Sequence, residues 1–202
     1  VMVGMLTTLS DPRLPIYAQK NSNGVYRGKP SGIEGVPNDD YNYDNVSAIG
    51  TKYLDPEFPG YFMTYSELMF LMAEAAHKGY IAGSAASYYN KGIEASFEFN
   101  GVSDKYAAYV AQTSVAYGVS TGLQKIAEQN WIALYCQGIE SWTEWRRTKY
   151  PVLSLPIDAE INEIPSRFNY PVIEQSVNKA NWEIAKTAMG GDDLTTKFWW
   201  LK

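Results

Sequence analysis

The sequence predicts a mainly α-helical fold with long irregular loops and few or no strands. Two observations favour helices after residue 63: apolar side chains recur there at helical spacing, and residues suited to capping stand where the helical stretches begin. A third observation argues against sheets, because almost no segment alternates apolar and polar residues.

The first helical stretch has the clearest start. Residues 64–67 have the spacing of a capping box, in which Thr64 accepts from the amide of Glu67 and the Glu67 carboxylate reaches back. A second helix begins at Ser84 and ends at Gly101. Because only a short turn joins the two helices, they are predicted to form an antiparallel, tetratricopeptide-like helical hairpin.

Four further helical stretches are predicted from capping residues, glycines and a proline. They begin at Ser103, at Ser120 or Thr121, after Gly138 and at Asn178. The third of these ends at Pro151 and the fourth at Gly190.

Residues 1–63 are predicted to be an irregular loop region. They hold most of the prolines and show no sustained helical period. So long a region without regular structure usually carries binding loops or packs against other structure. We interpret residues 1–202 as belonging to one domain, with this loop region followed by a helical region over residues 64–202.

The composition limits the possible ligands. The net charge of -5 excludes nucleic acid as a partner, because phosphate binding needs a basic stripe that this chain lacks. The single cysteine, Cys136, cannot form an internal disulfide and is expected to be a small buried apolar residue. Tyrosine is in excess, at 16 residues, and its flat ring with a polar tip suits carbohydrate and protein partners. A tyrosine-rich core and rim would explain the same excess.

Two motifs that could indicate catalysis or metal binding fail in their context. Residues 118–122 match the G-x-S-x-G nucleophile elbow, but that triad needs a later histidine, and the single histidine, His77, comes earlier. Asp40, Asn42 and Asp44 occupy the first ligand positions of an EF-hand loop, but its glycine and its final glutamate are missing. The sequence therefore predicts no catalytic residue, no metal site and no cofactor.

The segment 129–148 holds the densest set of chemical groups. Glu140 and Glu144 stand one helical turn apart, whereas a glycoside hydrolase needs two acids that flank a cleft. An ion pair between Glu144 and Arg147 would also lower the pKa of the carboxyl, and a general acid needs a raised pKa. We interpret the segment as a structural signature with core tryptophans and internal ion pairs. Its members are Trp131, Glu140, Trp142, Glu144, Arg146 and Arg147.

Candidate ligand-binding residues lie in the loops. The ring faces of Tyr41 and Tyr43 could stack on a sugar, while Asn42 and Asp40 bind its hydroxyl groups. A turn-rich surface loop without a ligand is the alternative interpretation of the same residues. The candidate set is Tyr26, Arg27, Tyr41, Asn42 and Tyr43.

Motifs of one family occur in order along almost the whole chain. They are SDPR at 10–13, YRG at 26–28, SE with AEA at 66–75, YNKGIEAS at 89–96, QNWIAL with ESWTEWRRT at 129–148, IPSR with YP at 164–171, and GGDD with WW at 190–200. Each motif is weak alone, but the ordered set is specific. The chain resembles the C-terminal part of the SusD/RagB-type outer-membrane glycan-binding lipoproteins of Bacteroidetes polysaccharide-utilisation systems.

This resemblance implies a non-enzymatic protein, built on tetratricopeptide-like helix pairs, that captures glycans at the cell surface. Its implied partner is a SusC-like TonB-dependent transporter in the outer membrane. The resemblance also implies that an N-terminal lipid anchor and most of the paired helices precede Val1, because the chain itself has no signal or lipidation site. Two alternatives stay open: a helical glycoside hydrolase, and a protein–protein scaffold of the transporter that binds no sugar.

Overall fold

Nine α-helices form most of the regular structure in residues 1–33 and 39–201, the part of the chain that the computed structural model describes. Within that part the β-type pairing is limited to one isolated bridge between Ala18 and Ile49, so the predicted mainly α fold is confirmed. Contacts divide the chain into two units, residues 1–153 and 154–202, which are described separately. That all 202 residues belong to one domain stays a prediction.

Short 3₁₀ helices punctuate the loops. They span Asp39–Tyr41, Thr51–Leu54, Ser103–Lys105, Val119–Thr121 and Trp199–Leu201. No helix in the described part of the chain is both long and apolar enough to cross a membrane.

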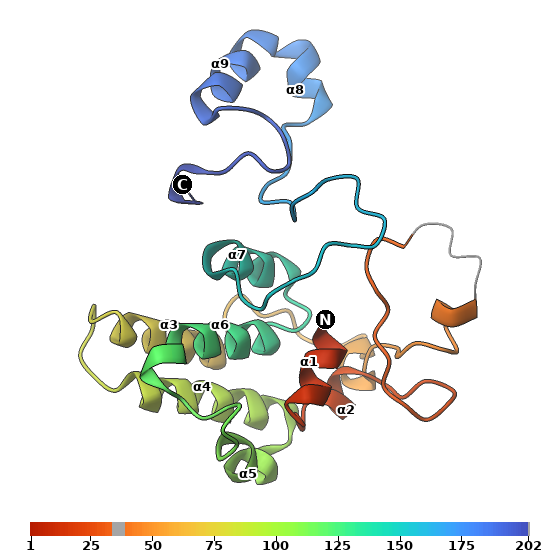
Figure 1. Ribbon diagram of the computed structural model, residues 1–202, viewed down its shortest axis with the longest axis vertical. Helices are drawn as coiled ribbons and strands as arrows, with labels where there is room; N and C mark the ends of the chain where they lie inside the picture. Colours follow the sequence, from red (N-terminus) through yellow and green to blue (C-terminus); the bar gives the residue numbers. More distant parts are fainter. Residues whose placement is uncertain (34–38, 202) are drawn as a thin grey trace. The chain divides into compact units, whose positions relative to one another are not determined.

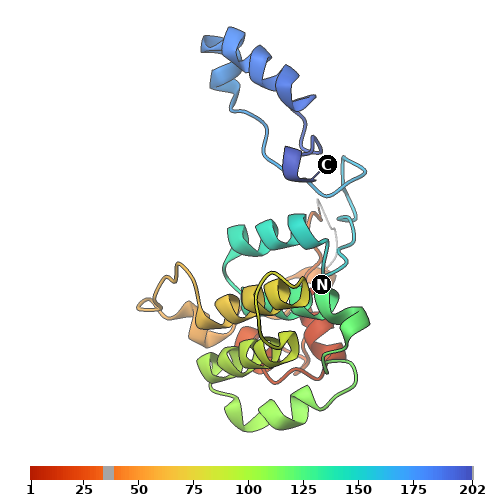
Figure 2. The same ribbon diagram turned by 90° about the vertical axis from the view of Figure 1, so that its left-hand side faces the viewer.

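The predicted helical hairpin consists of α3 (Tyr65–His77) and α4 (Ala85–Asn100), which lie side by side in Figures 1 and 2. The Thr64 side chain accepts from the amide of Glu67 at 3.2 Å, as predicted. Ser84 caps α4 in the same way, and Gly101 ends it in the left-handed conformation, with φ at 71°. Local sequence signals therefore define both helices.

The second half of the predicted capping box is also present, because a hydrogen bond from the Thr64 backbone stabilises the Glu67 carboxylate. One carboxylate oxygen of Glu67, Oε2, is buried and has no hydrogen-bond partner among the described residues. Burial raises the pKa of Glu67, the backbone hydrogen bond from Thr64 opposes this rise, and the negative charges of Glu140 and Glu144 on α7 (Gly138–Thr148) add to it, so the pKa is raised overall. The carboxylate thus reaches back to the start of its own helix and also senses the acids of α7.

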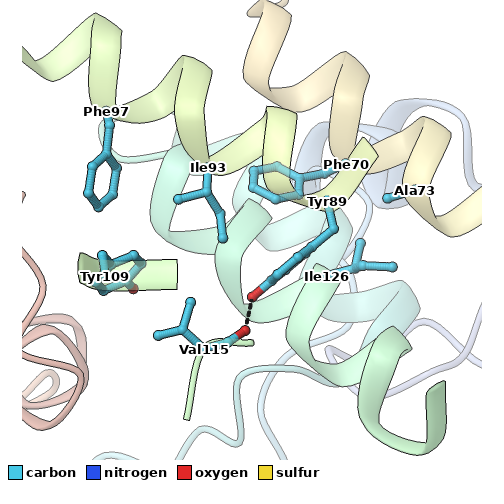
Figure 3. Packing of buried hydrophobic residues seen from close by; sticks show 8 residues of the cluster. All are labelled: Phe70, Ala73, Tyr89, Ile93, Phe97, Tyr109, Val115 and Ile126. Carbon is cyan, nitrogen blue, oxygen red and sulfur yellow. Dashed lines mark hydrogen bonds between the residues drawn. The ribbon is translucent and has the colours of Figure 1, made fainter. Parts of the chain in front are cut away.

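The first hydrophobic core joins α3, α4, α5 (Tyr106–Val110) and α6 (Gly122–Ala133), as Figure 3 shows. The Tyr89 hydroxyl donates to the carbonyl of Val115 at 2.7 Å, so this buried ring also satisfies its polar end. Gly92 lets α3 and α4 approach closely, because a Cβ there would lie 2.7 Å from the Phe70 ring. The buried members are Phe70, Ala73, Tyr89, Ile93, Phe97, Tyr109, Val115 and Ile126.

A second hydrophobic core packs α1 (Met2–Thr8) and α2 (Leu14–Tyr17) against the end of α6. Ile132 of α6 lies among Leu6, Leu14 and Tyr17, and all four are buried. The sequence predicted an irregular loop region for residues 1–63, so these two helices correct that prediction. Both are short, and their stability comes from burial against α6, which no local pattern reveals.

The start of α6 differs from its prediction. A 3₁₀ turn, Val119–Thr121, leads into the helix, and neither Ser120 nor Thr121 makes a side-chain capping bond. The predicted cap is therefore wrong, although the helix itself is present. Its partner α7 starts at Gly138, as predicted, and lies on the opposite side of α6 from α4 in Figures 1 and 2.

The second unit contains α8 (Val172–Val177) and α9 (Lys179–Met189), and Gly190 ends α9 with φ at 86°. Arg167 and Asp192 form a buried ion pair at 2.8 Å, and the Trp182 indole donates to the same carboxylate at 2.8 Å. The sequence indicated a solvated turn at residues 192–193. Asp192 is instead 7% exposed and anchors the unit, so that prediction is wrong.

Candidate functional site

A buried ion pair lies at the base of the loop region. The Arg13 guanidinium donates from Nε and Nη2 to the Asp11 carboxylate at 2.9 and 2.6 Å, and both side chains are fully buried. It also donates to Ser96 of α4 at 2.9 Å and to Gln129 of α6 at 2.8 Å. Burial alone would lower the pKa of Arg13, but the Asp11 carboxylate raises it overall.

This pair belongs to the SDPR motif, whose role the sequence left unassigned. Because one guanidinium bonds to both α4 and α6, it fixes the start of the loop region on the helical core. One signal in the sequence could have indicated this pair. Arg13 is followed by apolar residues, and an arginine can be buried only with a carboxylate such as Asp11 beside it.

At Gly50 the chain comes back into contact with α2, next to the start of the loop region. Its amide donates to the carbonyl of Tyr17 at 2.9 Å, and a Cβ at residue 50 would lie 1.8 Å from the carbonyl oxygen of Ile16. No larger residue fits this close backbone approach. Next to it, the amide of Gln19 donates to the carbonyl of Ala48 at 2.9 Å, so the two ends of the intervening loops are held together.

The structure brings Arg27 and Tyr41 together. The Arg27 guanidinium lies over the Tyr41 ring, 4.9 Å from its centroid. The backbone of Arg27 is fixed at both polar groups, since its amide donates to the Ser47 hydroxyl at 3.0 Å and its carbonyl accepts from the Ser47 amide at 2.7 Å. These two residues, 14 positions apart in the sequence, thus form one element of the surface.

Tyr43 stands on an anchored turn next to this element. The Asn42 side chain accepts from the amide of Asn45 at 3.0 Å, which closes the turn. Ser22 donates from its amide and its hydroxyl to the carbonyl of Asp44, at 3.0 and 2.6 Å. The Tyr43 side chain is 81% exposed, so a fixed backbone presents an open aromatic ring to solvent.

Tyr26 has a different environment from the other candidates. It is half-buried against the second core, and the Lys20 ammonium lies 5.8 Å from the centroid of its ring. Residues 34–38 lie outside the described residues.

We name Arg27, Tyr41, Asn42 and Tyr43 the loop surface.

The signature segment 129–148 forms helix contacts. Trp145 is buried, but Trp131 and Trp142 are only half-buried, so the expectation that all three lie in the core is wrong. The Arg146 guanidinium lies 4.1 Å from the centroid of the Trp142 ring. Glu140 is exposed at the start of α7.

Arg147 links α7 to α3. It donates to both carboxylate oxygens of Glu74 at 2.5 Å and to both oxygens of Glu144, at 3.2 and 2.7 Å. Burial raises the pKa of Glu74, but the hydrogen bonds and charges of Arg147 and Lys78 outweigh it and lower this pKa overall. The paired charges of the signature thus join two helices.

The remaining motif residues also have structural positions. His77 Nδ1 lies 2.6 Å from the Tyr117 hydroxyl, and Ser120 lies exposed in a 3₁₀ turn. Cys136 is exposed, with φ at 66°, between α6 and α7, so its predicted burial is wrong. Among residues 1–33 and 39–201, no group of histidine, cysteine and carboxylate side chains could hold a metal ion.

A cavity of about 350 Å³ opens between residues 53–61, the end of α4 and the start of α7. Five aromatic side chains are among its lining residues, and Glu140 is the carboxylate in its lining. We name it the aromatic cavity. Its volume lies within the roughly 300–1,000 Å³ range typical of ligand pockets.

Comparisons with known proteins identify the family. A family model described as starch-binding associating with outer membrane matches residues 1–171. No curated protein matches the chain. Several solved structures do match, and the chain spans about half the length of those described next.

One is a chitin-binding SusD homologue from Flavobacterium johnsoniae, with 27% identity and a TM-score of 0.85 over 98% of this chain and 48% of that one. A SusD homologue from Bacteroides fragilis has 27% identity and a TM-score of 0.83 over 100% and 50% of the two chains. Another, from Parabacteroides distasonis, has 26% identity and a TM-score of 0.78 over 94% and 44%. The chain belongs to the SusD-like family, which is described by starch binding and association with the outer membrane.

Proposed function

We propose that the chain is part of a non-catalytic protein that binds glycans at the bacterial cell surface through the loop surface. The observation that carries this proposal is the exposed Tyr43 ring on its anchored turn, beside the stacked pair of Arg27 and Tyr41. The names of relatives, which mention starch and chitin, support a glycan as the ligand.

The chemistry of the loop surface suits a sugar. A pyranose ring has an apolar face of C–H groups that packs on an open aromatic ring, and its hydroxyl groups need hydrogen-bond partners in fixed places. Tyr43 offers the ring, and the Arg27 guanidinium and the Asn42 amide offer N–H donors. Because the backbone at Ser22 and Ser47 already holds these residues in place, little loop ordering would oppose binding.

A glycoside hydrolase is less well supported. Such an enzyme needs two carboxyl groups that flank a cleft, with a raised pKa on the acid. Glu140 lines the aromatic cavity, whereas Glu144 is bound to Arg147. The carboxyl of Glu67 has a raised pKa, but its Oε2 atom is buried away from solvent and Glu67 is not part of the cavity lining.

The proposed partner is a SusC-like TonB-dependent transporter, to which the bound glycan is delivered. The proposed location is the surface of the outer membrane, with a lipid anchor on a segment that precedes this chain. The family description, which includes association with the outer membrane, supports this location.

The test measures sugar binding by calorimetry on the intact protein with starch-derived and chitin-derived oligosaccharides. Tyr43→Ala should weaken binding about 10-fold, because an aromatic contact of roughly 1 kcal/mol and the apolar area beneath the sugar are both lost. Tyr80→Ala is the matched control, since Tyr80 is 77% exposed on the α3–α4 connection.

The possible outcomes separate the three hypotheses. Equal effects of the two substitutions would refute binding at the loop surface. Transporter binding without any sugar binding would support the scaffold instead. Release of shorter sugars on incubation would support the hydrolase.

A further inference from the structure

The aromatic cavity has a continuous wall of rings drawn from three parts of the first unit. The Tyr53 ring lies 5.0 Å from Phe58 and 4.8 Å from Tyr135 between centroids, and Tyr61 lies 5.3 Å from Phe99. Rings in such tilted and edge-to-face contacts support one another and leave their outer faces to line the space.

Internal hydrogen bonds hold this wall in position. The Tyr53 hydroxyl donates to Asn100 Oδ1 at 2.8 Å, and the Tyr135 hydroxyl donates to the carbonyl of Tyr17 at 2.7 Å. The Tyr135 ring is also stacked on Tyr17 at 4.2 Å. Tyr61 is less enclosed, with 42% of its side chain exposed, so its ring is open to a ligand.

Polar groups of residues 137–140 also line the cavity. The Glu140 carboxylate is exposed there and can accept hydrogen bonds from hydroxyl groups. Gln137 also lines the cavity, and its Oε1 atom is buried without a hydrogen-bond partner among the described residues. The first turn of α7 has no side-chain cap. Aromatic rings and hydrogen-bond acceptors in one lining match the two kinds of surface of a sugar ring.

Along α4, two further cavities share lining residues with each other or with the aromatic cavity. A cavity of about 240 Å³ shares Phe99 and Ala133 with it, and one of about 390 Å³ shares Ala95 and Glu98 with the second. We name the three cavities together the trough. It belongs to different segments from the loop surface, which lies in residues 27–43.

The charges of the trough select among glycans. Three glutamates line it, Glu94, Glu98 and Glu140, against a single lysine in the same linings, Lys91. Like charges repel a sugar that carries carboxylate or sulfate groups, and carboxylates accept readily from neutral hydroxyls.

We propose that the trough beginning at the aromatic cavity is a second glycan-binding site, specific for neutral oligosaccharides. This inference rests on the proposed function, because it assumes that the protein binds glycans. The two sites are nevertheless separable, since they share no side chain. The Tyr61 ring stacks on a sugar unit, and the Glu140 carboxylate accepts from its hydroxyls.

The experiment titrates the intact protein with a malto-oligosaccharide and a chito-oligosaccharide as neutral probes, and with an oligogalacturonate as an acidic probe. Tyr61→Ala should weaken one neutral binding event about 10-fold, from the loss of one stacking contact. Phe62→Ala is the matched control, because the next residue along is fully exposed, at 103%, and does not line the cavity. Far-ultraviolet circular dichroism confirms that both variants remain folded.

A binding event that depends on Tyr61 and persists in Tyr43→Ala supports the second site. If Tyr43→Ala removes all binding and Tyr61→Ala behaves like Phe62→Ala, the proposed function stands and the second site is refuted. If only the Tyr61-dependent event is found, the trough is the glycan site and the loop surface is not. Preference for the oligogalacturonate at the Tyr61-dependent site, or no event that Tyr61→Ala weakens, also overturns the inference.

Discussion

Removing the Asp11 carboxylate should destabilise the first unit more than any exposed substitution. In Asp11→Ala the Arg13 guanidinium stays buried at 0% exposure with its counter-ion gone. Its remaining partners, Ser96, Tyr109 and Gln129, are neutral, so they stabilise the positive charge only in part. Breaking a buried ion pair in this way typically costs about 3–5 kcal/mol.

That loss is large compared with the total free energy of unfolding. Domains of this kind unfold with a free energy of about 5–15 kcal/mol, so a loss of about 3–5 kcal/mol in Asp11→Ala would remove roughly a fifth of it or more. The assay is urea unfolding followed by circular dichroism, which gives the free energy of unfolding from the midpoint and slope. The matched control is Asp104→Ala, which removes an exposed pair with Lys105 and should cause no measurable change.

A double variant separates two explanations of the loss. If the cost arises from an unpaired buried charge, then Asp11→Ala with Arg13→Met should be more stable than Asp11→Ala alone, because no charge remains buried. A loss below about 1 kcal/mol in Asp11→Ala, or a double variant less stable than the single one, would refute the reasoning.

Three further substitutions test the packing and the other ion pairs. Gly92→Ala should cost about 1–3 kcal/mol in urea unfolding despite a better helix propensity, because the new Cβ meets the Phe70 ring at 2.7 Å. Glu74→Gln should lower the free energy of unfolding by on the order of 1 kcal/mol above pH 4.5. This difference should vanish as the pH falls through the lowered pKa of Glu74, because the ion pair with Arg147 is then absent from both proteins. Asp192→Asn should speed hydrogen exchange about 10-fold at the Trp182 indole N–H, which donates to the Asp192 carboxylate. The reason is that hydrogen bonds to charged groups contribute roughly 1.5–3 kcal/mol.

The parts of the fold that the sequence predicts well are those set within one helical turn. The caps at Thr64 and Ser84 and the stop at Gly101 each involve residues only a few positions apart. Their side-chain chemistry is visible in any short window of the sequence. The hairpin of α3 and α4 was therefore predictable with its boundaries.

Features that depend on distant residues were not predictable in the same way. The short helices α1 and α2 exist because Ile132, more than 100 residues away, completes their core. Asp192 is buried because Arg167 reaches it, although the local sequence around it is typical of a turn.

The same distinction between local and long-range features applies to the candidate site. The sequence indicates which loops carry aromatic and polar residues, and hence the members of the loop surface. It does not reveal that Arg27 stacks on Tyr41, because that contact depends on the hydrogen bonds of Ser47. The aromatic cavity was missed altogether, since its wall combines rings from Tyr53 to Tyr135 that no motif connects.

One carbonyl group connects the two proposed sites. The oxygen of Tyr17 accepts from the amide of Gly50, which closes the base of the loops, and from the hydroxyl of Tyr135, which belongs to the aromatic wall. Arg13 fixes the same short helix, α2, to α4 and α6. Both sites are thus built on one rigid segment, so a bound sugar would have only exposed side chains such as Tyr43 to order, and less entropy would oppose its binding.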